Sequence, residues 1–140
     1  MNLKDCLREG LLRKFTFPEN TFRKELENSK HHLNNAKKCL DNDMFDLAIV
    51  SIYTSMFHAS RSILYRDNFK ERSHICLKIY LDEKYPSLKE HLIIFNAYRK
   101  NRHNMLYGLD ISAKKEDIIE GLNVSEEYLI KVKSLLREIV

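Results

Sequence analysis

Apolar residues recur every three or four positions along most of the chain, which is the spacing of one face of an α-helix. The pattern is strongest between Asp43 and Arg66, where apolar side chains also occur outside the main face. We therefore expect a widely buried central helix there, with Asp43 as its N-cap. Its main face comprises Phe45, Ala48, Ile49, Ile52, Tyr53, Met56, Ser60 and Ile63.

The same spacing predicts four other helices, at about residues 19–40, 72–84, 88–107 and 114–139. Ser87 and Glu90 have the spacing of a capping box at the start of the 88–107 helix, and Gly108 is suited to end it. Ser112 is a candidate N-cap for the last helix. Gly121 within that helix indicates either close helix packing or a kink.

Residues that break helices are few, with three Gly and two Pro in 140 residues. Sandwiches and barrels need a turn signal every ten residues or so, and this composition excludes them. The 44% hydrophobic and 31% charged residues are typical of a folded globular chain. The sequence predicts an all-α, up-and-down bundle of four to five helices. We expect one domain over 1–140, with a short helix in the leading segment 1–18.

The cysteines and the N-terminus bear on where the protein works. Cys6, Cys39 and Cys76 form no CxxC or zinc-ligand pattern, so we expect each to pack as a small apolar residue in a reducing cytosol. The N-terminus lacks the apolar run of a signal peptide, and no apolar stretch could span a membrane. We expect a cytoplasmic protein with no membrane partner, no metal site and no cofactor.

The basic end of the 88–107 helix is the main candidate for chemistry. The chain has 24 Lys and Arg against 20 Asp and Glu, and this net charge of +4 tolerates nucleic acid without requiring it. Arg99, Arg102 and His103 continue the apolar side of the helix, as side chains that line a cleft often do. A solvated cationic helix end is the other interpretation. Arg can bind phosphate and neutral His can act as a base, which would suit RNA cleavage without metal.

Residues of two other helices have weaker claims to chemistry. His31 and His32 lie on a charged helix and are expected to be exposed. His58 lies in the central helix, where we expect a hydrogen-bonded, partly buried side chain. We expect three neighbours of His58 to be structural parts of the core: Tyr53, Met56 and Phe57.

Two segments resemble those of the HEPN family (higher eukaryotes and prokaryotes nucleotide-binding). The first spans residues 46–64, and its Tyr-Thr-Ser-Met-Phe-His-Ala run is similar to a YYAMFHAA run of that family. The second, Arg102 to Gly108, resembles the R-x4-Y-G end of a later family helix. His74 matches the His of a K-T-H that often opens the short helix between them. The resemblance extends from about Phe22 to Ile139.

The resemblance implies a helical homodimer, often encoded beside a nucleotidyltransferase as a toxin–antitoxin pair. Many members are metal-independent ribonucleases in which an R-x4-6-H motif from each protomer meets at the dimer cleft. By position, Arg102 is the motif Arg and Tyr107 takes the place of the motif His. His103 and Asn104 are intervening polar residues, and Leu106 stands where the closest relatives usually have Asp.

Two classes of function follow from this resemblance. The first is binding of nucleotide or RNA at a dimer cleft through Arg99, Arg102 and Asn104, with endoribonuclease cleavage by Arg102, His103 and Tyr107 as its enzymatic version. Because the ordinary pKa of Tyr is near 10, Tyr107 is a poor base, and binding survives the replacement better than cleavage. The second is a non-catalytic helical interaction module that docks a partner nucleotidyltransferase. A generic four-helix scaffold is the third interpretation.

Overall fold

The computed structural model describes residues 1–106 and 114–137, and only the backbone in 103–106. Within these residues the chain forms six α-helices, one 3-10 helix and two short strands. The helices are α1 (Leu3–Arg8), α2 (Thr21–Asp41), α3 (Phe45–Arg66), α4 (His74–Lys84), η1 (Pro86–Leu88, 3-10), α5 (Lys89–Leu106) and α6 (Lys115–Leu136). The strands are β1 (Leu12–Lys14) and β2 (Phe69–Glu71).

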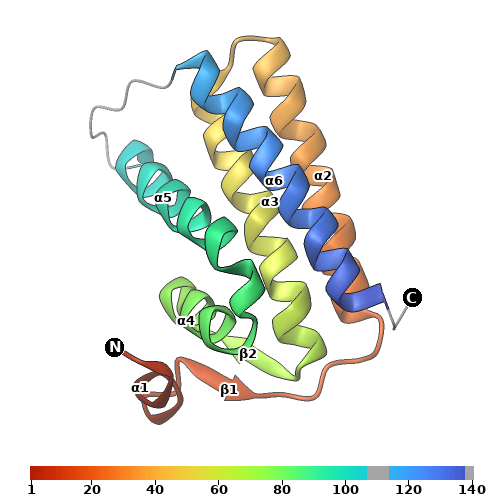
Figure 1. Cartoon of the computed structure of the whole chain (residues 1–140), viewed down its shortest axis with the longest axis vertical. Coiled ribbons are helices and arrows are strands. Elements are labelled where there is room, and N and C mark those ends of the chain that lie inside the picture. Colours follow the sequence, from red (N-terminus) through yellow and green to blue (C-terminus); the bar gives the residue numbers. More distant parts are fainter. Residues whose placement is uncertain (107–113, 138–140) are drawn as a thin grey trace.

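The long helices α2, α3 and α6 lie side by side, with α5 beside them and α1 and α4 at one end (Figure 1). The central helix is α3, which contacts α2, α4, α5 and α6. Its Tyr53 and Met56 are almost completely buried, as expected from the apolar pattern. Phe57 is only partly buried, which corrects its assignment to the core. The observed architecture confirms the predicted all-α helical bundle.

The turn between α2 and α3 differs from the predicted one. Asp43 has a φ of 56°, the left-handed conformation that commonly ends a helix. Its backbone N–H donates to the Leu40 carbonyl (3.1 Å), and that of Met44 donates to the Cys39 carbonyl (2.8 Å). Asp43 therefore closes α2, and α3 begins two residues later without the predicted side-chain cap.

Other helix ends follow the sequence in part. The Ser73 side chain caps α4 by accepting a hydrogen bond from the backbone of Cys76 (3.2 Å). Ser87 lies inside η1, which leads directly into α5, so the predicted capping box at Ser87 is wrong. Gly108 and Ser112, the predicted end of α5 and start of α6, lie outside the described residues.

Gly121 marks a close contact between α5 and α6, the first of its two predicted roles. A Cβ added there would lie 1.8 Å from the Tyr98 hydroxyl oxygen of α5. That hydroxyl donates to the Asp117 carbonyl of α6 (3.1 Å). The absent side chain lets Tyr98 lie flush against α6, which fixes the position of α5 in the bundle.

The leading segment is tied to the bundle in two ways that the sequence does not predict. The strands β1 and β2 pair antiparallel, with Arg13 opposite Lys70. A disulfide joins Cys6 of α1 to Cys76 of α4, so the expectation of separate, reduced cysteines is wrong for these two. Folding brings their Cα atoms to 5.8 Å although 70 positions separate them. Cys39 is free. None of the described helices has the length and apolar content needed to cross a bilayer.

Candidate functional site

The two arginines of α5 lie on the side of that helix which faces α3. The Arg102 guanidinium lies over the ring of Tyr53, 5.4 Å from the ring centroid. Arg99 donates from Nε to the Asn96 side-chain oxygen (3.1 Å), one turn earlier on the same helix. Both arginine side chains are partly buried, whereas the neighbouring Lys100 is exposed. The helix thus keeps both arginines partly buried and holds the Arg102 guanidinium over α3.

An aromatic layer lies beneath these arginines. The Tyr53 ring is nearly parallel to that of Phe95, with centroids 5.1 Å apart. The imidazole of His74, the first residue of α4, stacks on the Phe57 ring at 4.3 Å. The hydroxyl of Tyr53 is hydrogen-bonded to Nδ1 of His74. Three helices, α3, α4 and α5, therefore each contribute rings to one aromatic layer, in which Tyr53 and Phe95 are buried.

Arg61 extends the same surface along α3. Tyr53, Phe57 and Arg61 are four residues apart, which places them on one side of the helix. The Arg61 guanidinium lies 5.2 Å from the Phe57 centroid and 4.7 Å from that of Tyr65. We call this arrangement of arginines and rings the basic–aromatic face. It consists of Tyr53, Phe57, Arg61, His74, Arg99 and Arg102.

Charge on this face favours a neutral imidazole. Burial lowers the pKa of His74 below its usual value, and Arg102, Arg61 and Arg99 lower it further. Burial raises the pKa of Tyr53 to about 12, against the opposite influence of Arg102 and Arg99. At neutral pH the face therefore carries cationic guanidinium groups around a neutral His74 and a protonated Tyr53.

Glu71 of β2 is the acidic neighbour of this face. Its Oε1 lies 3.1 Å from Nε of Arg61 in an ion pair, although the geometry leaves that Nε without a hydrogen bond. The other carboxylate oxygen, Oε2, is also buried without a hydrogen bond. Burial raises the pKa of Glu71, and Arg61 opposes that shift. The Arg61–Glu71 pair is thus incompletely satisfied in its hydrogen bonds, although the carboxylate offsets part of the charge of Arg61.

The structure brings together only some of the residues that the sequence singles out. Arg99 and Arg102 lie on one face, as their spacing predicts. The backbone of His103 and Asn104 continues α5, but their side chains lie outside the described part of the chain. Tyr107 lies outside it as well. The roles assigned to all five residues stay predictions.

Sequence reasoning misses Tyr53, Phe57, Arg61 and His74 as parts of this face. The four-residue spacing of Tyr53, Phe57 and Arg61 could have indicated a stripe that turns from aromatic to cationic. No local sequence pattern identifies His74 as part of the face, because its contact with Tyr53 forms only when α4 packs against α3. Its place in the family resemblance is the one hint that the sequence offers.

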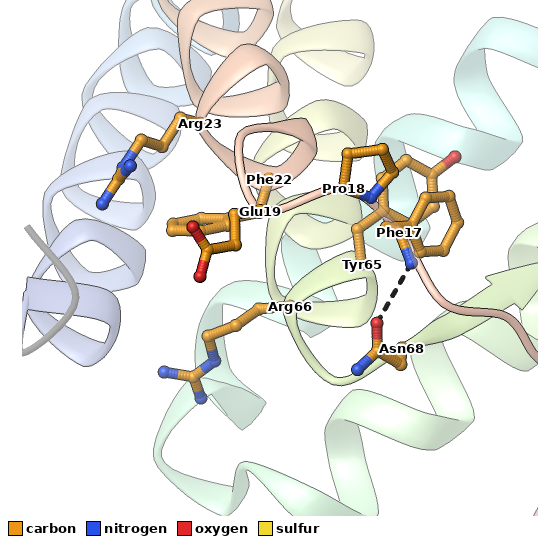
Figure 2. A pocket seen from close by; sticks show the side chains of 8 residues that line it. All are labelled: Phe17, Pro18, Glu19, Phe22, Arg23, Tyr65, Arg66 and Asn68. Carbon is orange, nitrogen blue, oxygen red and sulfur yellow. Dashed lines mark hydrogen bonds between the residues drawn. The ribbon is translucent and has the colours of Figure 1, made fainter.

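A hollow of about 330 Å³ lies at the C-terminal end of α3, beyond Arg61 (Figure 2). Phe17 stacks on Tyr65 at 4.0 Å, and its backbone N–H donates to the Asn68 side-chain oxygen (3.2 Å). Figure 2 shows the Glu19 carboxylate on the same side of the hollow as the Arg66 side chain. Because Arg66 also pairs with Asp67 (3.5 Å), the hollow mixes acidic and basic groups and does not favour an anion.

The histidines of α2 and α3 are mainly structural. His58 is partly buried and pairs with Glu25 through Nδ1, as expected of a satisfied histidine. His31 is exposed, but His32 is half-buried and stacks on His58 at 5.3 Å, which corrects its predicted exposure. In residues 1–102 and 114–137, no group of three or more His, Cys, Asp or Glu side chains could hold a metal ion.

Comparison with known proteins bears on both the fold and the face. No curated protein matches the chain. The family model of the HEPN domain matches residues 22–137, which includes all six residues of the basic–aromatic face. Because this match covers most of the chain, the protein belongs to the HEPN family of helical domains, which is named for nucleotide binding.

Proposed function

We propose that the protein binds nucleotide or RNA through phosphate groups at the basic–aromatic face. The observation that carries this proposal is the placement of Arg102 over Tyr53, beside Arg99 and His74. A guanidinium that an aromatic ring already holds in place loses little conformational freedom when it binds a phosphate in its two-pronged geometry. The arrangement therefore favours a phosphate over a simple counterion.

The charges on the face support an anionic ligand. Arg61 is matched by Glu71 (3.1 Å). Among the described residues, no carboxylate forms an ion pair with Arg99 or Arg102, whose contacts are with Asn96 and Tyr53. Two partly buried cations with no carboxylate partner in residues 1–102 and 114–137 support a local excess of positive charge that a phosphate would neutralise.

The same proposal includes a homodimer whose two copies meet at this end of α5. A two-fold axis brings two identical basic patches together and would close a cleft over them. Light scattering at micromolar concentration should then give about twice the 16.7 kDa chain mass. A mass equal to that of one chain would contradict the dimer cleft and leave a single-chain binding face.

Endoribonuclease cleavage is the enzymatic form of this proposal. The 2′-oxygen of the RNA would form a bond to the adjacent phosphorus as the bond from phosphorus to the 5′-oxygen breaks. Arg102 would stabilise the charge on the phosphoryl oxygens, and His103 or Tyr107 would take the 2′ proton and protonate the leaving oxygen. Cleavage that persists in EDTA and disappears in Arg102→Ala would establish it. His103→Ala should slow cleavage and leave binding largely intact.

The alternative is a non-catalytic module that docks a nucleotidyltransferase, the other half of a toxin–antitoxin pair. The replacement of the motif His by Tyr107 favours this version, because an unperturbed Tyr is a poor base at neutral pH. RNA that binds but stays intact, together with a stable complex with a nucleotidyltransferase encoded by the adjacent gene, would favour the module.

Binding of a fluorescent single-stranded RNA by Arg102 variants tests the proposal at one fixed salt concentration. Arg102→Ala should weaken binding about tenfold or more, since it removes hydrogen bonds to a charged group. Arg102→Lys should also weaken it, because an ammonium lacks the planar fork. Lys100→Ala is the matched control, an exposed cation on the same helix. Equal losses in Arg102→Ala and Lys100→Ala would show diffuse charge attraction instead of a site.

A further inference from the structure

We propose that His74 binds a phosphate oxygen of the ligand through its Nε2–H, in a tautomer that Tyr53 selects. This inference rests on the proposed function and extends the arginine site to a second helix, α4. It assigns His74 as a binding residue and Tyr53 as the positioning residue behind it. The class of ligand remains a nucleotide or RNA phosphate.

The tautomer follows from the hydrogen bond of a buried hydroxyl. Tyr53 is 2% exposed, and His74 Nδ1 is its sole hydrogen-bond partner among the described residues. A buried O–H that did not donate would lose a hydrogen bond without compensation, so the Tyr53 hydroxyl donates and Nδ1 accepts. A neutral imidazole whose Nδ1 accepts must carry its proton on Nε2.

The Nε2 atom is available to a ligand. No hydrogen bond in the described part of the chain uses this nitrogen. The nitrogen is also not fully enclosed by protein atoms, so a ligand can reach it. The ring is held by its stacking on Phe57 at 4.3 Å as well as by Tyr53. An N–H on an immobilised ring is a preorganised donor, which binds with little loss of conformational entropy.

The surroundings of His74 determine which ligand this N–H suits. Arg102, Arg61 and Arg99 all lie near enough to act on the charge of the ring. These three arginines disfavour a protonated, positively charged His74 and create a positive electrostatic potential around its ring. A neutral donor surrounded by cations suits an oxyanion. It is poorly suited to proton transfer, since a neutral imidazole rarely gives up its N–H.

Histidine-detected ¹⁵N NMR of the full chain tests the tautomer. The chain has six histidines, and His74→Gln identifies the His74 signals by their loss. At neutral pH we expect the proton of His74 on Nε2. In Tyr53→Phe, which keeps the ring and removes the hydroxyl, the Nδ1–H tautomer should become populated. A proton on Nδ1 in the unmodified protein would overturn the inference.

Binding of the same fluorescent RNA tests the contact. His74→Leu removes the donor and should weaken binding about tenfold, the loss expected for one hydrogen bond to a charged group. His74→Gln offers an amide N–H and should recover part of that loss. Thermal unfolding of both variants establishes that each is folded at the assay temperature.

The outcomes separate this inference from the proposed function. If Arg102→Ala loses binding while folded His74→Leu binds like the unmodified protein, the arginine site stands and the role of His74 is wrong. If the unmodified protein does not bind RNA or nucleotide, both proposals fail. Weaker binding by His74→Leu together with the Nε2–H tautomer supports the inference.

Discussion

On one side of α3, Ser55 faces α2 and α6, and on the other side, about 200° of helix rotation away, Tyr53 faces α4 and α5. The Ser55 side is fully buried and hydrogen-bonded. Ser55 donates to the Ser29 carbonyl (2.9 Å), Ser29 donates to the Ser55 carbonyl (2.8 Å), and Ser125 donates to the Ser55 hydroxyl (3.3 Å).

The Tyr53 side is built from larger and more polar groups that are less completely satisfied. Arg61 Nε and Glu71 Oε2 are buried without hydrogen bonds, and His74 Nε2 has no partner among the described residues. Cations rest on aromatic rings there instead of on carboxylates alone.

The difference indicates which side of α3 serves folding and which can serve binding. A polar group whose partners are all internal has nothing to offer a ligand, whereas one left partly satisfied at a reachable surface can gain a partner on binding. Small serines also let α2 and α6 approach α3 closely, while the bulky rings hold the cationic groups at the surface. Four substitutions test this contrast.

The largest effect is expected inside the bundle, at Met56. This residue is 0% exposed, so Met56→Ala should reduce the free energy of unfolding by about 2–5 kcal/mol. Leu47→Ala on the same helix is the control, because Leu47 is 50% exposed and should change that free energy far less. Urea unfolding measures both, and equal losses would contradict the assignment of Met56 to the core.

The next largest effect is expected for Gly121→Ala, which should reduce the free energy of unfolding by about 1–3 kcal/mol. The new Cβ would overlap the Tyr98 hydroxyl and push α5 away from α6. The sign is diagnostic, because Gly→Ala inside a helix otherwise stabilises by roughly 0.5–1 kcal/mol. Thermal unfolding beside the exposed control Asn123→Ala checks it, and a stabilised Gly121→Ala would show that the two helices are not in close contact there.

Ser55→Ala tests the serine contacts directly. It removes one donor and leaves the Ser125 hydroxyl without its acceptor, for an expected loss of about 1–2 kcal/mol in the free energy of unfolding. Ser51→Ala, one turn earlier and only partly buried, is the matched control. RNA binding should be the same in both variants. A binding defect confined to Ser55→Ala would mean that the two sides of α3 are coupled.

The smallest effect is expected for Glu71→Gln, within about 1 kcal/mol at neutral pH, because losing the attraction to Arg61 is offset by no longer burying a charged carboxylate. Burial raises the pKa of Glu71 above 4.5. Between pH 4.5 and the pKa of the folded protein, the folded carboxyl therefore keeps a proton that the unfolded one has lost. Its contribution to stability therefore falls as pH rises from 4.5 through the folded pKa. Urea unfolding at pH 5 and pH 8 should show a smaller fall for Glu71→Gln than for the unmodified protein. A larger fall in the variant would reverse the assigned direction.

Much of the fold could be predicted because helices leave a local periodic signal. The apolar spacing places α3 within two residues of its observed start. Gly121 indicates either close helix packing or a kink, and the structure shows the packing, against α5. The pairing of β1 with β2 and of Cys6 with Cys76 leaves no such signal, since each joins residues far apart in the chain.

The candidate site is only partly predictable for the same reason. The spacing of Arg99 and Arg102 indicates one face of α5, and the structure agrees. Tyr53 is predicted as a core residue, and its ring is buried there while its hydroxyl is hydrogen-bonded to His74. Such a dual role depends on a neighbour from another helix, which a periodic pattern does not identify.

The Cys6–Cys76 bond divides the covalent chain into a closed ring, a short N-terminal segment and a long C-terminal tail. The ring includes α2 and α3 and carries Tyr53, Arg61 and His74, whereas α5 with its two arginines belongs to the tail. A single cut in the loop between α2 and α3 would open the ring without releasing a fragment, whereas a cut before α5 would release the tail under denaturing conditions. The basic–aromatic face is therefore one of the places where the tail packs against the closed ring, and the contacts of α6 with α2 and α3 are another.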